Sequence, residues 1–253
     1  MGIRPVADFE TLNYQIMTNL NTSTEAQNTT ETAIGFIPCY RLPFLSLFHA
    51  DCMEIMKQYP DKYFDLAIVD PPYGIDKLLY RSSYGNCAGS LTKYSENRWD
   101  KEVPTDEYFA ELMRVSKNQI IWGGNYFKLP PTRGVLCWDK QKHVPNFSAW
   151  EMAWTSFDCV AKIFRKLNID PKRIHPTQKP TSLYDWLLKE FAKEGDLILD
   201  THFGSGSIAL AVDKANRLDK MNLHLTACEI DKEYIDKAIK RISESIKQGT
   251  MSF

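Results

Sequence analysis

The sequence predicts an α/β fold, a Rossmann-like, doubly wound and mainly parallel sheet of seven strands with one antiparallel strand. Two observations lead to this prediction. Short apolar runs alternate with amphipathic stretches along most of the chain, which is the pattern of strands joined by crossover helices. Two of the apolar runs also end in an aspartate at a turn, Asp70 and Asp200, and an open α/β sheet binds ligands beyond the carboxyl ends of its strands.

Each element has its own signal. The run 64–69 is apolar enough for a buried strand, and the last predicted helix carries isoleucines on one stripe. Strands 134–138 and 149–156 are close enough in sequence to form an antiparallel pair. The predicted strands are 44–49, 64–69, 118–122, 134–138, 149–156, 196–200 and 223–228. The predicted helices are 51–59, 105–116, 181–193, 207–216 and 231–247.

The N-terminal segment differs in composition from the rest of the chain. Residues 1–34 include a Thr- and Asn-rich stretch with few large apolar groups, so we predict a mobile polar tail with room for a short helix near 8–17. Residues 35–253 form one predicted domain. Within it, 74–104 and 158–175 show little periodicity and are interpreted as insertions.

The composition narrows the classes of function. The 253 residues carry a formal net charge of −1, so any attraction to nucleic acid must come from local charge. The six cysteines show no Cys-x-x-Cys spacing and no histidines at metal-binding spacing, which favours reduced thiols and no metal site. No apolar run reaches ~18 residues and no signal peptide is recognisable, so we expect a cytoplasmic protein without a membrane span.

The motif Asp70-Pro71-Pro72-Tyr73 is the most informative part of the sequence. It follows the buried run 64–69. The carboxylate accepts hydrogen bonds, the prolines fix the backbone so that a carbonyl can face a ligand, and the tyrosine offers a flat face for stacking. Together these groups could hold a planar ring by its exocyclic amine. An ordinary proline turn at a strand end is the alternative interpretation.

A second motif consists of a strand, a glycine turn and a helix. The predicted strand 196–200 is followed by the turn 201–207, with the sequence THFGSGS. Glycines let the backbone approach a ligand closely, and a helix N-terminus favours negative groups. Glu229 ends the next strand 23 residues after Gly206, near the spacing at which an acid binds ribose hydroxyls in nucleotide-binding βαβ units. No Gly-Lys-Ser/Thr follows, which argues against a phosphate-binding P-loop.

With these motifs the chain resembles the S-adenosylmethionine-dependent amino-methyltransferases of DNA, in the permuted β-group whose catalytic tetrapeptide precedes the glycine turn. The segment 175–180, HPTQKP, is similar to the one before the glycine strand in that group, and the stretch from Asp51 to the tetrapeptide also matches. The resemblance covers roughly residues 44–242. One departure concerns the family's usual Asp-Pro-Phe-x-Gly-Ser-Gly-Thr turn, because either His202 or Phe203 could replace the phenylalanine that contacts the cofactor.

The resemblance implies methyl transfer to the exocyclic amine of a base flipped out of duplex DNA. Asp70 and the Pro71 carbonyl would accept the two amine hydrogens, and Tyr73 would stack on the base. Lys179 has an electrostatic reason to bind the cofactor's carboxylate, although a solvated lysine is an equal alternative. The implied catalytic residues are Asp70, Pro71, Pro72 and Tyr73. The implied cofactor-binding residues are Asp51 at the adenine, Glu229 at the ribose, and Thr177, Lys179, Asp200, His202, Phe203, Gly204, Ser205 and Gly206.

The two predicted insertions mix basic and aromatic residues, which suits phosphate contact and base stacking. Solvated loops with ordinary lysines are the alternative. The predicted DNA contacts are Lys162, Arg165, Lys166, Lys172, Arg173, Arg81, Lys93 and Arg98.

Several alternatives for the substrate stay open. In this family, aspartate rather than serine before Pro-Pro-Tyr favours adenine N6, but cytosine N4 also presents an exocyclic amine. Methylation of RNA or of a protein amide, and a non-catalytic nucleic-acid-binding subunit, are further alternatives. The resemblance implies double-stranded DNA as the partner, with no membrane contact. It leaves room for a homodimer and for a cognate restriction endonuclease in a prokaryotic or phage-infected cell.

Overall fold

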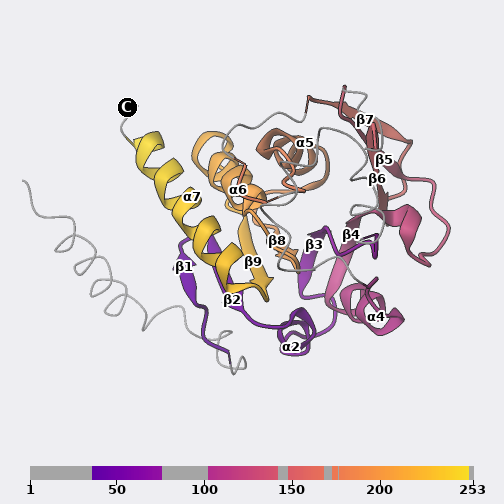
Figure 1. The fold of residues 1–253 in the computed structure, drawn as a ribbon, viewed down its shortest axis with the longest axis horizontal. Coiled ribbons are helices and arrows are strands. Elements are labelled where there is room, and N and C mark those ends of the chain that lie inside the picture. The colour runs from indigo at the N-terminus through magenta and orange to yellow at the C-terminus, as the bar shows by residue number, and fades with distance from the viewer. Residues whose placement is uncertain (1–35, 76–101, 142–147, 168–172, 176, 251–253) are drawn as a thin grey trace, which may run out of the picture. The chain divides into compact units, whose positions relative to one another are not determined.

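The protein is described from a computed structural model, which describes residues 36–75, 102–141, 148–167, 173–175 and 177–250 (Figure 1). The chain divides into two units, Met1–Gly35 and Phe36–Phe253. The first unit, which holds the predicted polar tail, lies outside the described residues. Most of the predicted insertion 74–104 does so as well.

The described part of the second unit is built on a nine-stranded sheet in the order β1-β2-β9-β8-β3-β4-β6-β5-β7 (Figure 1). Seven strands point the same way, while β1 and β6 run antiparallel to their neighbours. The strands are β1 (Tyr40–Leu42), β2 (Leu45–His49), β3 (Phe64–Val69), β4 (Ser116–Trp122), β5 (Val135–Asp139), β6 (Trp150–Thr155), β7 (Lys162–Arg165), β8 (Leu197–Asp200) and β9 (His224–Glu229).

All seven predicted strands are present, and they include one antiparallel strand, β6, which pairs with both β4 and β5. The predicted number of strands is wrong because β1 and β7, at the two edges of the sheet, were missed. β1 has three residues, and β7 carries two charges in four residues, as edge strands often do. The segment 158–175, which we expected to be an inserted loop, therefore contributes a strand to the sheet.

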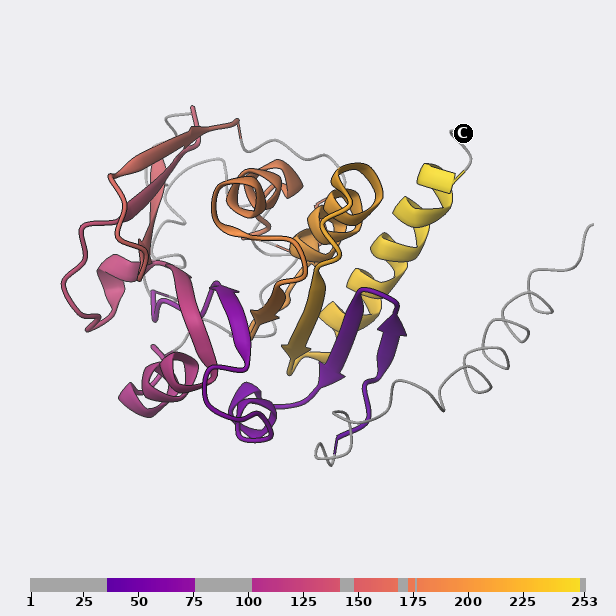
Figure 2. The same ribbon diagram turned by 180° about the vertical axis from the view of Figure 1, so that it is seen from behind.

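Helices cover both faces of the sheet, as the doubly wound prediction requires (Figure 1; Figure 2). Their bounds agree with the predicted helices to within a few residues. None of the helices in the described part of the chain is both long and apolar enough to cross a membrane. On one face lie α5 (Thr181–Phe191), α6 (Ser207–Asp219) and α7 (Lys232–Thr250). On the other lie α2 (Cys52–Met56) and α4 (Asp106–Val115).

The core lies along the central strands. In β3 the last four residues, 66–69, are at most 1% exposed, because helices cover both faces of the strand. Because both faces of the strand are buried, its residues 66–69 form a continuous apolar run and do not alternate between apolar and polar residues. This burial also anchors the Asp-Pro-Pro-Tyr motif that follows directly after Val69.

Three neighbouring parallel strands bring three acids to one edge of the sheet. In β8, Leu199 pairs with Ala67 of β3 on one side and with Thr226 of β9 on the other. The carboxyl ends of the three strands carry the acids Asp70, Asp200 and Glu229. Parallel strands in register present their ends at the same edge, so residues from distant parts of the sequence meet there.

Candidate active site

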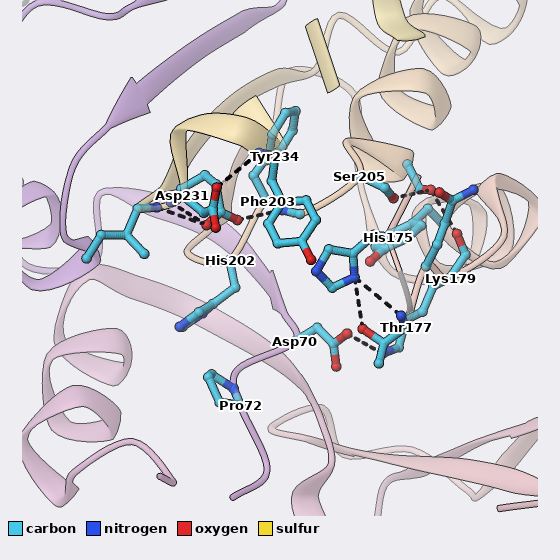
Figure 3. Close-up of a pocket in the computed structure, with 16 residues that line it drawn as sticks. Asp70, Pro72, His175, Thr177, Lys179, His202, Phe203, Ser205, Asp231 and Tyr234 are labelled. Carbon is cyan, nitrogen blue, oxygen red and sulfur yellow. Dashed lines mark hydrogen bonds and ion pairs between the residues drawn. The ribbon is translucent and has the colours of Figure 1, made fainter. Parts of the chain in front are cut away.

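A cavity of about 450 Å³ lies at this edge, between the ends of β3, β8 and β9 and the segment that leads into α5 (Figure 3). The structure places nine of the fourteen predicted catalytic and cofactor-binding residues in its lining. They are Asp70, Pro72, Thr177, Lys179, His202, Phe203, Gly204, Ser205 and Glu229. The other five are not part of the lining, namely Asp51, Pro71, Tyr73, Asp200 and Gly206.

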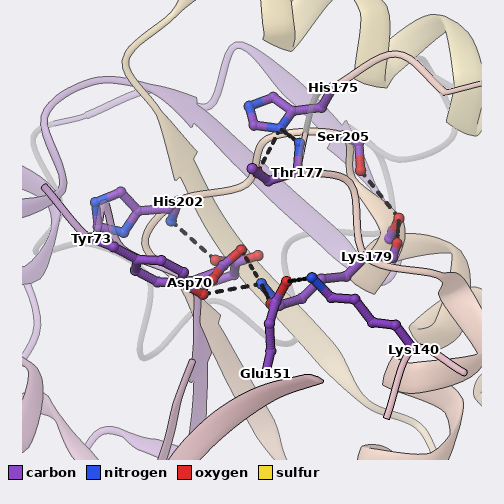
Figure 4. A network of polar contacts seen from close by, with 11 residues as sticks. Asp70, Tyr73, Lys140, Glu151, His175, Thr177, Lys179, His202 and Ser205 are labelled. Carbon is purple, nitrogen blue, oxygen red and sulfur yellow. Dashed lines mark hydrogen bonds and ion pairs between the residues drawn. The ribbon is translucent and has the colours of Figure 1, made fainter. Parts of the chain in front are cut away.

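Asp70 is held from two sides (Figure 4). Tyr73 Oη donates a hydrogen bond to Asp70 Oδ1 at 2.5 Å, within the turn that the prolines form. Lys179 forms an ion pair with Asp70 Oδ2. The side chain of Asp70 is 21% exposed and lines the cavity. The cavity wall therefore carries an oriented hydrogen-bond acceptor.

The Tyr73 ring packs against the turn that follows β4. It stacks on Tyr126 with ring centroids 4.9 Å apart and an interplanar angle of 13°. Gly123, with a φ of +72°, allows the close approach, because a Cβ atom there would lie 2.2 Å from the Tyr73 ring. Tyr126 is 43% exposed. The two rings form an aromatic surface beside Asp70.

Lys179 is a buried charge in an alternating network (Figure 4). Its side chain is 2% exposed, and besides Asp70 it contacts Glu151 Oε2 at 3.2 Å. Lys140 Nζ contacts the other Glu151 oxygen at 2.6 Å. Burial favours the neutral amine, but Asp70 and Glu151 outweigh it and raise the pKa of Lys179 above its ordinary value. Burial would likewise raise the pKa of Glu151, yet the two lysines lower it.

Glu229 closes the opposite side of the cavity. Its Oε2 accepts a hydrogen bond from the Gly204 amide at 2.8 Å, and its Oε1 accepts from the amides of Ile230 and Asp231 at 2.9 and 3.0 Å. Burial raises the pKa of Glu229, and the three amide donors oppose that shift. The carboxylate thus joins the glycine turn to the end of β9.

The glycine turn is fixed by contacts from three directions. Gly206 begins α6 with a φ of +69°, and a Cβ there would meet the Phe203 ring at 3.1 Å. Ser207 Oγ donates to the backbone oxygen of Lys179 at 2.8 Å. Arg241 of α7 donates to the backbone of the turn at 2.9 Å. These contacts hold the turn in a fixed position relative to Lys179.

Asp200 and His202 lie at the base of the turn. Asp200 is 2% exposed, and burial raises its pKa to about 7 even though it accepts the His202 amide at 3.0 Å. Burial lowers the pKa of His202 to about 4, so the imidazole is neutral. Thr201 Oγ1 bonds to His202 Nδ1 at 2.9 Å and to Tyr108 Oη at 2.6 Å. Phe203 is 4% exposed, so of the two candidates His202 offers more surface to the cavity.

The segment before α5 supplies another wall. The His175 ring packs on Tyr234 of α7 with centroids 4.3 Å apart, and His175 Nδ1 lies 3.1 Å from Thr177 Oγ1. Burial lowers the pKa of His175 to about 4. Asp51 is exposed and caps α2 by accepting the Met53 amide at 2.7 Å. Its charge opposes the lowering of the His202 pKa, so the two residues are electrostatically coupled.

The eight predicted DNA contacts fall into three groups, namely two ion-paired residues, two further described residues and four residues that the structure does not describe. Lys162 pairs with Glu190 of α5 at 2.6 Å, and Arg165 pairs with Asp139 of β5 at 3.5 Å. Successive side chains of a strand alternate between its faces, so the two cations point to opposite faces of β7. Lys166 is exposed and Arg173 is half-buried. The remaining four lie outside the described residues, namely Arg81, Lys93, Arg98 and Lys172.

Sequence reasoning missed several residues of the site. Glu151 is a single acid in the apolar strand Trp150–Thr155, and that isolated charge was the signal available. Tyr126 and Tyr234 carry no signal in the sequence, because their role depends on which rings they meet. Within the described residues, no group of three or more His, Cys, Asp or Glu side chains could hold a metal ion.

Comparisons with known proteins find DNA methyltransferases that are similar to this chain. A family model described as DNA methylase, of the N6/N4 type, matches residues 135–240. The Type II methyltransferase M.HinfI of Haemophilus influenzae is 26% identical, over 79% of this chain and 68% of its own length. The Type II methyltransferase M2.MboI of Moraxella bovis is 24% identical, over 66% of this chain and 78% of its own length.

Solved structures share the fold. The PvuII DNA methyltransferase, described as cytosine-N4-specific, matches with a TM-score of 0.55 and 14% identity, over 85% of this chain and 95% of its own. M1.HpyAVI in complex with S-adenosylmethionine matches with a TM-score of 0.50 and 20% identity, over 78% and 99% of the two chains. With its acidic tetrapeptide ahead of the glycine turn and both at one sheet edge, the chain is similar to DNA methylases of the N6/N4 type.

Proposed function

We propose that the protein is a site-specific DNA methyltransferase that transfers the methyl group of S-adenosylmethionine to N6 of adenine in double-stranded DNA. One observation carries this proposal. Asp70, oriented by Tyr73 and Lys179, borders the same cavity that the glycine turn and Glu229 close from the other side. An acceptor for an amine and an acid suited to ribose hydroxyls therefore face one space.

The cavity suits the cofactor in charge and size. S-adenosylmethionine carries positive charge on its sulfur and on its amino group, and the carboxylates of Glu229 and Asp231 line the cavity. A volume of about 450 Å³ is typical of small-molecule sites. At Gly204, a Cβ atom would find no neighbour closer than His175 at 3.9 Å, so the missing side chain leaves space for a ligand. The relative M1.HpyAVI, solved with S-adenosylmethionine, supports this assignment.

The residues of the tetrapeptide align the reacting amine. The bound cofactor supplies a methyl group that is electrophilic because it is attached to positively charged sulfur. Asp70 and the Pro71 carbonyl accept the two amine hydrogens, so the nitrogen lone pair points toward the methyl carbon. With the cofactor bound, the nitrogen–carbon bond would form as the carbon–sulfur bond breaks, which would leave S-adenosylhomocysteine, and the proton released by the nitrogen would pass to water. Alignment and electrostatics do the catalysis, without a covalent enzyme intermediate.

The target base must leave the duplex to reach this position, at a cost of a few kcal/mol. The aromatic surface formed by Tyr73 and Tyr126 lies next to Asp70 and offsets part of that cost by stacking. Lys166 and Arg173, on the described part of the predicted DNA segment, are candidates for phosphate contact. A homodimer and a partner endonuclease stay predictions.

Identification of the product tests the proposal. The protein is incubated with isotope-labelled S-adenosylmethionine and duplex DNA, and the digested nucleosides are separated by mass spectrometry. We expect N6-methyldeoxyadenosine, with Asp70→Ala as the inactive control. Label found on cytosine N4 alone would replace adenine by cytosine, while label found on RNA or protein alone would reject DNA as the substrate. Intact cofactor binding without any transfer would favour a non-catalytic binding subunit.

A further inference from the structure

Glu151 lies next to the proposed catalytic motif although it comes from a distant, antiparallel strand. It belongs to β6, which pairs with β4 and β5, and its carboxylate lies between the ammonium groups of Lys179 and Lys140 (Figure 4). Lys179 in turn contacts Asp70. The four side chains alternate in sign, and their formal charges sum to zero. No role in the motif-based mechanism accounts for Glu151.

We propose that Glu151 is a positioning residue for methyl transfer, which holds the Lys179 ammonium against Asp70 and thereby fixes the carboxylate that accepts the base amine. This inference rests on the proposed function and deepens it. It assigns Lys179 to the carboxylate of the tetrapeptide, whereas the family resemblance implies a role at the carboxylate of the cofactor.

Burial explains why Lys179 needs Glu151. The Lys179 side chain is 2% exposed, and its ammonium has lost nearly all contact with water. Its remaining neighbours are the Tyr73 hydroxyl at 3.4 Å and the Trp122 ring, whose centroid is 5.3 Å away. A buried cation is stable only with compensating charge and hydrogen bonds. Without Glu151, the ammonium would have Asp70 as its charged partner and only the long hydrogen bond to the Tyr73 hydroxyl besides it.

The contact also explains how Asp70 keeps its orientation. The Tyr73 hydroxyl holds Oδ1 and Lys179 holds Oδ2, so the plane of the carboxylate cannot rotate. Each carboxylate oxygen can accept more than one hydrogen bond, which leaves lone pairs for the base amine. If the Tyr73 ring moves when a base stacks on it, Lys179 is the contact that preserves the orientation. Lys140, at 18% exposure, anchors the far oxygen of Glu151.

The test compares single-turnover methyl transfer and cofactor affinity in Glu151→Gln, Lys179→Met and the double variant. Gln has the size of Glu but lacks its charge. We expect Glu151→Gln to lower the transfer rate at saturating cofactor and DNA by about 10-fold, the lower end of the loss seen when outer-shell residues that orient metal ligands are replaced. The dissociation constant for S-adenosylmethionine, measured by calorimetry, should change by less than about twofold. Lys179→Arg should retain more of the rate than Lys179→Met.

The double variant separates positioning from a general structural effect. Glu151 acts through Lys179, so adding Glu151→Gln to Lys179→Met should change the rate by less than about twofold. Asp185→Asn is the matched control, because Asp185 is 17% exposed and ion-paired to Lys214 at 2.6 Å, away from the cavity lining. Its rate should equal that of the wild type.

Three results would overturn the inference. One is a Glu151→Gln variant with the wild-type rate on a substrate that the wild type methylates. Another is a pair of fully additive effects in the double variant. The third is a Lys179→Met variant whose only defect is weaker cofactor binding, which would return Lys179 to the cofactor site. A wild-type protein that transfers no methyl group to DNA would instead reject the proposed function and the inference with it.

Discussion

The two halves of the candidate site are built in different ways. The half proposed to bind the cofactor, called the cofactor half and defined as residues 200–207 and 229–231, consists of two short stretches of chain. Its shape depends on backbone amides, on two glycines with positive φ and on one carboxylate that joins the stretches. The half proposed to align the base, called the catalytic half and defined as Asp70, Tyr73, Tyr126, Glu151 and Lys179, consists of side chains from segments far apart in the sequence.

This difference predicts separable effects of substitution. Backbone conformation and an acid at the end of a strand shape the cofactor half, so changes there should alter cofactor affinity first. Charge and ring contacts between side chains shape the catalytic half, so single substitutions there should alter the rate and leave the cofactor bound. Five predictions for the two halves, and one for the DNA surface, follow from the largest expected effect to the smallest.

Asp70→Ala should cause the largest loss. Removal of the acceptor that aligns the amine should lower turnover by at least ~10²-fold, as for deletion of one preorganised electrostatic group. Cofactor affinity should stay within about twofold, since Asp70 belongs to the catalytic half. Rate measurements at saturating cofactor, paired with calorimetry, check both statements. Near-normal methylation by this variant would remove Asp70 from the mechanism.

Glu229→Ala should weaken cofactor binding and leave the rate nearly unchanged. The ribose hydroxyls would lose a charged acceptor worth about 1.5–3 kcal/mol, so cofactor affinity should fall by roughly one to two decades. The rate at saturating cofactor should be close to that of the wild type. Glu233→Ala, which removes an exposed acid from α7, is the control. Calorimetry that finds unchanged affinity for Glu229→Ala would contradict the ribose assignment.

Cofactor affinity should rise with pH through the titration of Asp200. Burial raises its pKa from an ordinary 3.8 to about 7, so at pH 6 the carboxyl is mostly protonated and cannot attract the cationic cofactor. Ionisation between pH 6 and 8 should strengthen binding about tenfold. Asp200→Asn should flatten this dependence in calorimetric titrations. A wild-type affinity that is constant from pH 6 to 8 would exclude the effect.

The titration of Asp200 should also change the stability of the fold. As pH rises, stability should fall while cofactor affinity rises. In the folded protein Asp200 keeps its proton up to about pH 7, whereas in the unfolded chain it loses it near 3.8. The unfolded state binds fewer protons in this range, so the contribution of Asp200 to the free energy of unfolding falls as pH rises from about 4 to about 7. Thermal unfolding of Asp200→Asn beside the wild type measures this contribution.

Tyr126→Ala tests the aromatic part of the catalytic half. The stack with Tyr73 is worth about 0.5–1.5 kcal/mol, so its loss should weaken capture of the flipped base by roughly two- to tenfold. The effect should appear in the KM for DNA or in the rate of base flipping, followed with a fluorescent base analogue. A change in cofactor affinity instead would show that substitutions in the two halves do not have separable effects.

The smallest effects belong to the DNA surface. Neutralising a lysine that touches phosphate lowers the slope of log affinity against log salt by ~0.9. Lys166→Ala should show such a change, because Lys166 is exposed. Lys162→Ala should show less, because Lys162 is already paired with Glu190. The measurement is DNA binding of the wild type and both variants over a range of salt concentrations. Equal slopes for the three proteins would show that neither lysine contacts phosphate.

The sequence predicted much of the fold because its signals are local. An apolar run such as 64–69 and the stripe of isoleucines in α7 reflect burial of one element, whichever partners cover it. The edge strands β1 and β7 were missed for the same reason. They have little burial of their own and exist through pairing with β2 and β5, which no local pattern records.

The candidate site follows the same division. By itself the sequence determined the local geometry of the proposed cofactor half, because strand, glycine turn, helix and terminal acid are consecutive and their geometry follows from backbone conformation. Only the tertiary structure decided the catalytic half beyond its tetrapeptide. Lys179 meets Asp70 and Glu151 because sheet order places β6 near β3 and the glycine turn fixes the segment before α5. Ion pairs and ring stacks depend on distances in space, and spacing along the chain does not encode them.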